Sequence, residues 1–289
     1  AINRLFPERI GEAAEKETDE EALEDQNCQT FHEVLSGVGK YNITVPSKRE
    51  GYIEGIDGGS LISLGQELNG VVELMCKPGD YITQDQLLAR VWCQDQTETE
   101  EDSEEQIETV NNTVNRVIII GLRRTPRQDV TYAARELVEI ALRALSPGIN
   151  DPFTAMSCVD RLGGALGRLV ERSCPSQIRR DSESVPRLLI TTADGFAEVL
   201  KYSFGMIRES GSSNTAVSLK ILEALTGITS HASRPEDIEV IRQEAEALQT
   251  AFEEHHLVKA DLTSFQQAFD QLNNLLESSL RMTREPELS

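Results

Sequence analysis

The chain has 289 residues, of which 39% are apolar, and a formal net charge of −21 at pH 7. This length and apolar content predict one or two folded domains with a substantial core. The strong negative charge argues against binding to nucleic acid or to anionic lipid, because its long-range field repels phosphate.

The N-terminal segment, residues 1–36, is acidic and has a sparse helical pattern of apolar residues. The chain begins at Ala1, carries no signal-peptide pattern, and its longest apolar runs, such as Val117 to Leu122, are far shorter than the roughly 20 residues that cross a bilayer. We therefore expect a soluble fragment preceded by membrane helices, with residues 1–36 as a membrane-exit helical segment. Arg4 and Arg9 near that exit favour the cytoplasmic face of the inner membrane.

Residues 37–95 predict a small β domain. Apolar and polar residues alternate around Ile43, and the turn Pro78-Gly79-Asp80 separates further short strands. The sequence from this turn to Val91 resembles the closing half of a biotinyl or lipoyl carrier domain, which implies a small β-sandwich or half-barrel. The lysine that such carriers modify is absent from the hairpin position. We therefore expect no covalent cofactor.

An acidic linker is predicted at residues 96–110, because the stretch from Glu98 to Glu108 holds seven acidic residues. Such a run is typical of a solvated, disordered segment, with a cation-binding or partner-binding tail as the alternative. Residues 113–122 are rich in β-branched side chains and fit either a strand or a helix.

Residues 111–289 predict a helical domain of about six amphipathic helices. Within it, residues 173–186 are expected to form a loop, and Leu188 to Ile190 a brief extended piece. The fold class is therefore α+β, with a small β domain followed by a predominantly helical bundle.

The corner from Ser146 to Thr154 is the most specific local pattern in the helical part. Pro147 and Gly148 end one amphipathic helix, and Asp151 is placed to cap the next, with Pro152 in its first turn. Capping and turn chemistry explain these residue types. The alternative is a polar site at the start of the second helix.

This corner and the sequence before it resemble a family of predicted bacterial membrane proteins of unknown function, family 2254 of the unknown-function series. The resemblance rests on Arg124 with the Arg-x-x-x-x-Asp spacing, on the helix around Leu137, and on Ser-Pro-Gly-Ile-Asn-Asp-Pro-Phe-Thr-Ala at the corner. It extends to Lys77-Pro78-Gly79-Asp80 and spans most of residues 1–230. It implies several transmembrane helices followed by a soluble C-terminal part, and it implies no established activity.

Standard catalytic and metal-binding signatures are absent from the sequence. The five cysteines are scattered and form no Cys-x-x-Cys pair, which argues against structural zinc and disulfides and favours reduced thiols in a cytosol. His255 and His256 are neighbours on a predicted helix and point in different directions, so they do not suit one metal ion. We expect no metal and no cofactor.

The best polar set lies around the first helix of the helical domain. Arg124 and Asp129 precede this helix, whereas Asn150 and Asp151 follow it, roughly 25 Å away at 1.5 Å per residue. The two groups cannot form one compact site within a subunit, but they could meet across an interface. Structural ion pairs are the simplest role, and a small anion held by two arginines is the alternative. The candidate ligand or interface residues are Arg124, Asp129, Arg135, Asn150, Asp151 and Arg161.

The function that follows is a non-enzymatic one. We expect the cytosolic, self-associating module of an integral membrane protein, which regulates or gates a channel-like or transporter-like membrane region and forms a homo-oligomer near the corner. Its partners would be its own copies, its membrane helices and an unidentified small ligand. One alternative is a hydrolase or transferase that uses Asp129, Asn150 and Asp151 with arginine support. Another is a passive protein-binding scaffold.

Overall fold

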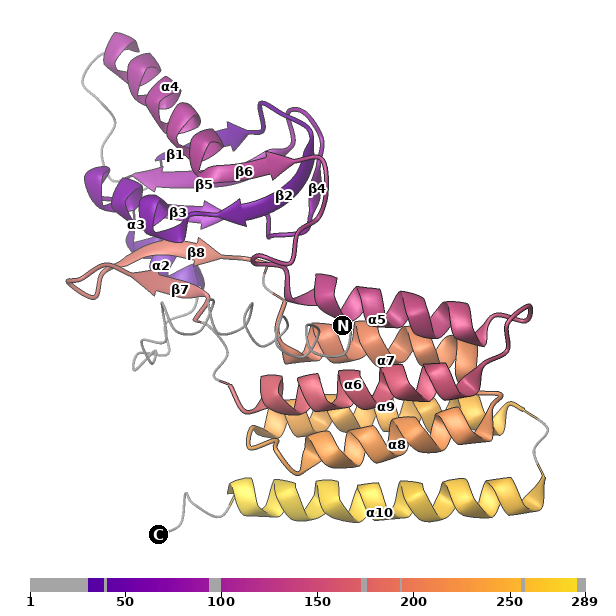
Figure 1. Cartoon of the computed structure of the whole chain (residues 1–289). Helices are drawn as coiled ribbons and strands as arrows, with labels where there is room; N and C mark the ends of the chain where they lie inside the picture. Colours follow the sequence, from indigo (N-terminus) through magenta and orange to yellow (C-terminus); the bar gives the residue numbers. More distant parts are fainter. Residues whose placement is uncertain are drawn as a thin grey trace. The chain divides into compact units, whose positions relative to one another are not determined.

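The computed structural model describes most of the chain as two compact units (Figure 1). The β unit comprises residues 31–38, 41–93, 100–129 and 176–192. The helical unit comprises residues 130–172, 194–255 and 258–284. Most of the predicted membrane-exit segment, residues 1–36, lies outside the described residues.

The described strands of the β unit form two sheets. The larger has the order β1-β5-β3-β8-β7, with β1 at Tyr41–Pro46, β5 at Leu87–Cys93, β3 at Val71–Leu74, β8 at Pro186–Ile190 and β7 at Ile178–Arg180. The smaller has the order β4-β2-β6, with β4 at Tyr81–Ile82, β2 at Gly51–Ile56 and β6 at Ile118–Gly121. Neighbouring strands are antiparallel except for β3 and β8, which are parallel.

Alternating apolar side chains explain where the core of the β unit lies. In β1, Ile43 and Val45 are buried while Thr44 between them is exposed. Ile43 faces Val91 of β5 across the sheet, and Val72 of β3 faces Val91 from the other side. These residues belong to one apolar cluster that includes both sheets. The alternation predicted around Ile43 is therefore confirmed.

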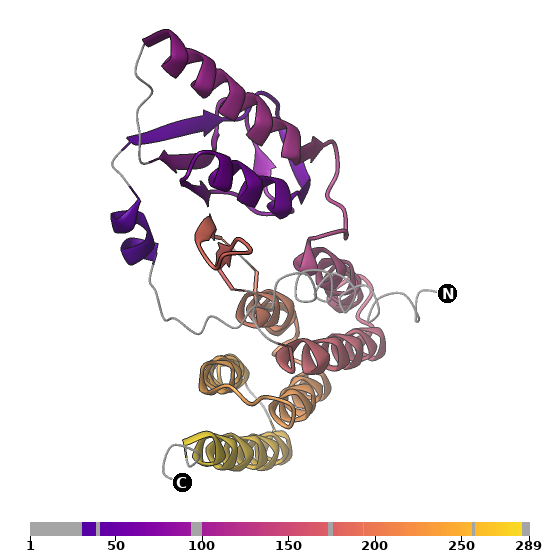
Figure 2. The ribbon, with the colours of Figure 1, turned by 90° about the vertical axis from the view of Figure 1, so that its left-hand side faces the viewer.

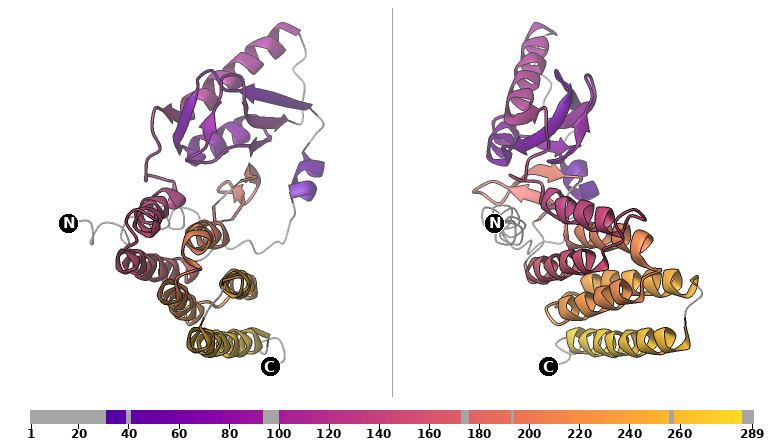
Figure 3. Two further views of the ribbon diagram at one scale, coloured as in Figure 1. Left: turned by 90° about the vertical axis from the view of Figure 1, so that its right-hand side faces the viewer. Right: turned by 45° about the vertical axis from the view of Figure 1, so that its right-hand side comes forward.

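Three described helices belong to the β unit: α2 at Phe31–Gly37, α3 at Gly58–Glu67 and α4 at Glu100–Val117. Most of the stretch predicted as an acidic linker, residues 96–110, falls within α4. The helix forms because Val110, Val114 and Val117 recur at three- and four-residue steps and are buried, while acidic side chains cover the exposed side. It packs along β1 and β6 (Figure 3), and the ambiguous stretch 113–122 is helix up to Val117 and strand β6 after it.

The hairpin of β7 and β8 differs most from the sequence-based expectation. Residues 173–186 were expected to form a loop of the helical domain, whereas residues 176–192 belong to the β unit. Strand β8 pairs with β3, so that Val72 lies beside Leu188 and Leu74 beside Ile190. The carrier-like sandwich is not confirmed; the parallel β3–β8 pair adds a strand from a distant part of the sequence.

The predicted helical part is present, and its described residues form six helices. They form three consecutive helical hairpins, which Figure 2 views nearly along the helix axes. The members of the hairpins are α5 (Val130–Leu145) with α6 (Pro152–Val170), α7 (Phe196–Gly211) with α8 (Thr215–Thr229), and α9 (Pro235–Glu253) with α10 (Lys259–Arg284).

The hairpins stack so that α5, α7 and α9 form one layer and α6, α8 and α10 form the other. The buried apolar side chains of the six helices make one continuous cluster, which includes Leu162, Phe204, Leu225 and the stacked pair of Phe252 and Phe265. This arrangement is like that of helical repeat proteins, in which each hairpin buries its apolar face on its neighbours.

A buried ion pair joins α7 to α9. The Nε atom of Arg208 donates to Glu244 at 2.9 Å, and burial raises the pKa of Glu244 despite the opposing effect of Arg208. Because the folded pKa lies above the unfolded one, the charged carboxylate destabilises the fold at neutral pH, and stability is regained as the pH falls through the raised value.

We expect Glu244→Gln to remove this part of the pH dependence. In wild type, the free energy of unfolding should rise relative to the variant as the pH falls from neutral towards the ordinary glutamate pKa of 4.5. Far-ultraviolet circular dichroism during urea unfolding of both proteins would measure it. Identical pH profiles for the two proteins would contradict the assignment.

Candidate functional site

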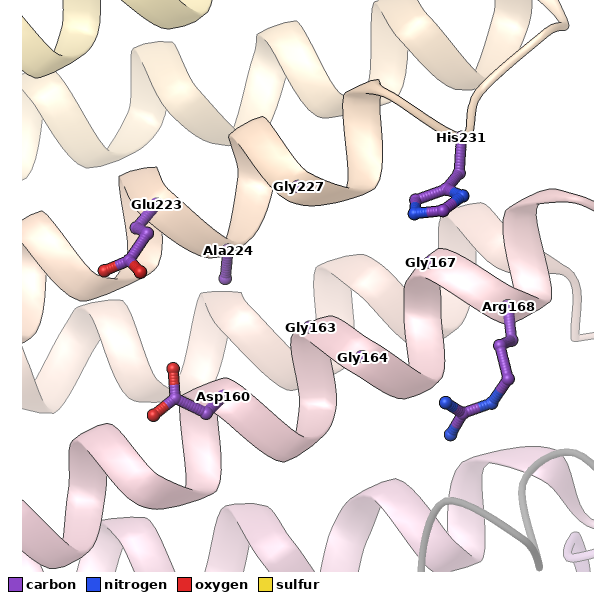
Figure 4. A pocket seen from close by; sticks show the side chains of 9 residues that line it. All are labelled: Asp160, Gly163, Gly164, Gly167, Arg168, Glu223, Ala224, Gly227 and His231. Atoms are coloured by element: carbon purple, nitrogen blue, oxygen red, sulfur yellow. The ribbon is translucent and has the colours of Figure 1, made fainter.

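A groove of about 400 Å³ lies between α6 and α8 of the helical unit (Figure 4). It is lined by Asp160, Gly163, Gly164, Gly167 and Arg168 from α6, by Glu223, Ala224 and Gly227 from α8, and by His231 just after α8. Within each helix these residues recur at steps of three or four and so share one face. The opposite faces, with Leu162 and Leu225, are buried in the core.

Helices α6 and α8 run in the same direction. Asp160 contacts Lys220, Gly163 contacts Ala224 and Glu171 contacts His231, so the residue numbers rise together along both helices. The helices approach closely at Gly163, where an added Cβ atom would lie 3.0 Å from the Cβ of Ala224. Small residues therefore allow the close approach of the two backbones.

The floor of the groove is open above two glycines. A Cβ atom added to Gly164 or to Gly227 would have no neighbouring heavy atom within 4 Å among those compared. Both glycines are exposed, whereas the residues that follow them, Ala165 and Ile228, are buried. The groove thus has a floor of backbone atoms that a ligand or another helix could approach closely.

One end of the groove is acidic. Asp160 and Glu223 both pair with Lys220, at 3.3 and 2.7 Å. The hydrogen bond to Glu223, followed by the one to Asp160, raises the pKa of Lys220. Two carboxylates share one ammonium group, so this end keeps one excess negative charge.

The other end of the groove carries His231 and Arg168 (Figure 4). The Nδ1 atom of His231 lies 2.6 Å from Glu171, and Arg234 donates to the carbonyl of Arg172 at 2.8 Å, which caps the end of α6. Arg168 is exposed and has no ion pair within the described ranges. The groove therefore has an excess negative charge at one end and, at the other, the positive charge of Arg168.

The structure brings Arg124 and Asp129 together in the β unit. The Nε and Nη2 atoms of Arg124 lie 2.8 and 2.6 Å from Oδ2 of Asp129. Only 1% of the Asp129 side chain and 22% of the Arg124 side chain is exposed. Such a buried, doubly contacted carboxylate is a structural group.

The same pair holds the turn that follows β3. Gly79 has φ +91°, and a Cβ atom there would lie within 3 Å of both Asp129 and Arg124. Its amide donates to the carbonyl of Ile53 at 2.8 Å. Only glycine fits this backbone conformation and this space, which explains the Pro-Gly-Asp pattern.

Asn150 and Asp151 lie at the corner, as predicted. Asn150 has φ +46°, a conformation that asparagine tolerates. Asp151 caps α6, because its side chain accepts hydrogen bonds from the amide and the hydroxyl of Thr154 at 3.1 and 2.6 Å. These hydrogen bonds lower the pKa of Asp151, so the capping interpretation is supported by the geometry.

The remaining two candidates lie on separate helices. Arg135 pairs with Glu139 one turn later in α5 at 2.8 Å. Arg161 is half-buried on α6, and its charge opposes the effect of burial, which raises the pKa of Cys158. An anion site made by Arg135 and Arg161 stays a prediction.

None of the six predicted residues lines the groove. The sequence does carry a signal for it: Gly163-Gly164-x-x-Gly167 in α6 and Ala224-x-x-Gly227 in α8 place small residues on one helical face. Sequence reasoning followed the charged residues and overlooked this spacing, because small residues in a helix are also ordinary packing positions.

A family model described as Predicted membrane protein (DUF2254) matches residues 4–227. The chain is 30% identical over 185 residues to the uncharacterized protein Rv1290c of Mycobacterium tuberculosis and to the uncharacterized protein Mb1321c of Mycobacterium bovis. Each match covers 64% of this chain and 34% of the relative, so the chain spans about a third of the length of these relatives. No solved structure is significantly similar to the chain. Across the described ranges, none of the helices combines the length and apolar character needed to span a membrane.

Proposed function

Because the chain belongs to the family of predicted membrane proteins described as DUF2254, we propose that it is the cytoplasmic, self-associating module of an integral membrane protein. The membership confirms the resemblance found in the sequence. In this proposal, association of the modules regulates or gates the membrane region.

The observation that carries the proposal is an exposed apolar pair at the corner between α5 and α6. Ile149 is 56% exposed and Phe153 is 76% exposed. Large exposed apolar side chains at the two ends of one short turn are typical of a protein contact. The corner is also where the sequence predicts a subunit contact.

An enzymatic role has weaker support. Asp129 is almost fully buried against Arg124, and Asp151 accepts the hydrogen bonds that cap α6. Both carboxylates therefore have structural partners, and neither is free to act as a base in this arrangement.

We expect the 289-residue chain to form an oligomer at micromolar concentration and Phe153→Ser to weaken its association about tenfold or more, because an exposed aromatic anchor would be lost. Size-exclusion chromatography with light scattering would measure this. Met282→Ser is the matched control, since Met282 is 74% exposed on α10, far from the corner in the sequence. A wild-type chain that stays monomeric would refute the proposal.

A further inference from the structure

The groove between α6 and α8 carries the same order of residue types twice. On α6, Asp160, Gly164 and Arg168 follow one another at four-residue steps. On and just after α8, Glu223, Gly227 and His231 do the same. Each series reads acid, glycine, base, and each has an exposed glycine at its centre.

Such a pattern is self-complementary under a two-fold rotation. If the axis crosses α6 at Gly164, α6 faces its own copy in the antiparallel direction. Asp160 then faces Arg168 of the second copy, and Arg168 faces the second Asp160. The contact closes on itself after two copies, as an isologous interface requires.

The charges that are not balanced within one chain support the same arrangement. Asp160 and Glu223 share Lys220, which leaves one negative charge in excess, while Arg168 has no ion pair in the described part of the chain. Glu171 already pairs with His231. The strongest cross-contact is therefore that of Arg168 with the acidic end around Asp160 of the other copy.

The two exposed glycines leave room for a second helix to approach the groove closely. No side chain stands above Gly164 or Gly227, and the space next to them is open in the single chain. Small residues at these positions let two helix backbones approach closely, as in helix pairs that pack through glycine faces. A stack of helical hairpins also offers its outer layer as an extended binding surface.

We propose that a second copy of this chain docks antiparallel on the α6–α8 groove, with Asp160 of each copy against Arg168 of the other. This inference rests on the proposed self-association and names a contact surface distinct from the corner at Phe153.

The test is a heterodimer experiment with the full chain. Asp160→Arg and Arg168→Asp should each weaken self-association at least about tenfold, because like charges would then face each other. A one-to-one mixture of the two variants should associate again, since a chain with two arginines meets a chain with two aspartates. Light scattering and sedimentation of each variant and of the mixture would measure this. Arg281→Asp, on the exposed side of α10, is the control for a simple change of net charge.

A second variant separates shape from charge. Gly164→Leu places its Cβ atom in space that is open in a single chain, and at concentrations where wild type is monomeric it should leave the melting temperature unchanged or higher, because leucine is the better helix former. It should nevertheless weaken self-association at least about tenfold. If wild type associates, Phe153→Ser disrupts it and the groove variants do not, the groove contact is wrong while the proposed function stands. A monomeric wild type would overturn both.

Discussion

Replacing Arg187 by methionine is expected to lower the free energy of unfolding of the β unit by about 3–5 kcal/mol, because it leaves a buried carboxylate without its cation. The Nε atom of Arg187 donates to Asp181 at 2.8 Å, and both side chains are buried. Its Nη1 atom also reaches the carbonyl oxygens of Gly65 and Gly70, at 3.4 and 3.3 Å. Arg187 thus links the β7–β8 hairpin to the last turn of α3 and to the residue before β3.

The measurement is simple because Trp92 is the only tryptophan in the chain and lies in β5 of the β unit. Its fluorescence reports unfolding of this unit, whereas circular dichroism is dominated by the helices. We expect the variant to shift the fluorescence transition in urea to lower concentration. An unchanged fluorescence transition would contradict the role of Arg187.

The pH dependence gives an independent check. Burial alone would raise the pKa of Asp181, but hydrogen bonds from Arg187 and from the amides of Val185 and Glu183 lower it below its ordinary value. A lowered pKa contributes stability above the unfolded value of about 3.9, and that contribution is lost as the pH falls through the folded pKa. The difference between wild type and Asp181→Asn should therefore shrink below about pH 4.

The second large effect is expected at Arg124. Arg124→Met should destabilise the β unit by about 3 kcal/mol, near the lower end of the range for a broken buried pair, because part of the guanidinium reaches solvent. The carboxylate of Asp129 would remain buried beneath the Gly79 turn without the guanidinium. Urea unfolding followed by Trp92 fluorescence measures this loss.

The matched control is the double variant Arg124→Met with Asp129→Leu. It removes the buried charge together with its partner, and it should recover much of the lost stability if the pair is structural. A double variant no more stable than Arg124→Met would show that Asp129 holds the turn by other contacts.

Several features of the fold follow directly from local sequence. Asp151 and Pro152 predict the start of α6, and Asp151 caps that helix through Thr154. The alternation of Ile43 and Val45 with polar residues predicts β1. In these cases the residues that determine the structure are neighbours in the sequence, so a short window contains the physical cause.

The features that were missed depend on distant partners. The extended piece at Leu188 to Ile190 was predicted and lies in β8, but its parallel partner β3 is far away in the sequence, so nothing local shows that Leu188 belongs beside Val72. In α4, the many acidic residues led to the prediction of a linker, although Val110, Val114 and Val117 form an apolar stripe. Burial of that stripe against β1 and β6 supplies the stability that composition alone does not predict.

In the candidate site, too, the contact between residues close in the sequence was predicted and the contact between distant residues was not. Arg124 and Asp129 were identified, and they do meet, because five residues in a tight loop bring them together. The groove requires that α6 lie parallel to α8, although the β7–β8 hairpin and helix α7 stand between them in the sequence. The spacing of Gly163 and Gly167 could suggest a close helix contact, but it does not identify Ala224 as the neighbour.

The split of the β unit also constrains how the chain can be made. Strand β3 ends at Leu74 and its partner β8 begins at Pro186. One edge of β3 therefore has no partner strand while about 110 residues are synthesised, which takes roughly 6–20 s at about 5–20 residues per second. Helices α5 and α6 leave the ribosome during this interval. The nascent β unit therefore carries an open strand edge, which can pair with other chains, until the return hairpin arrives.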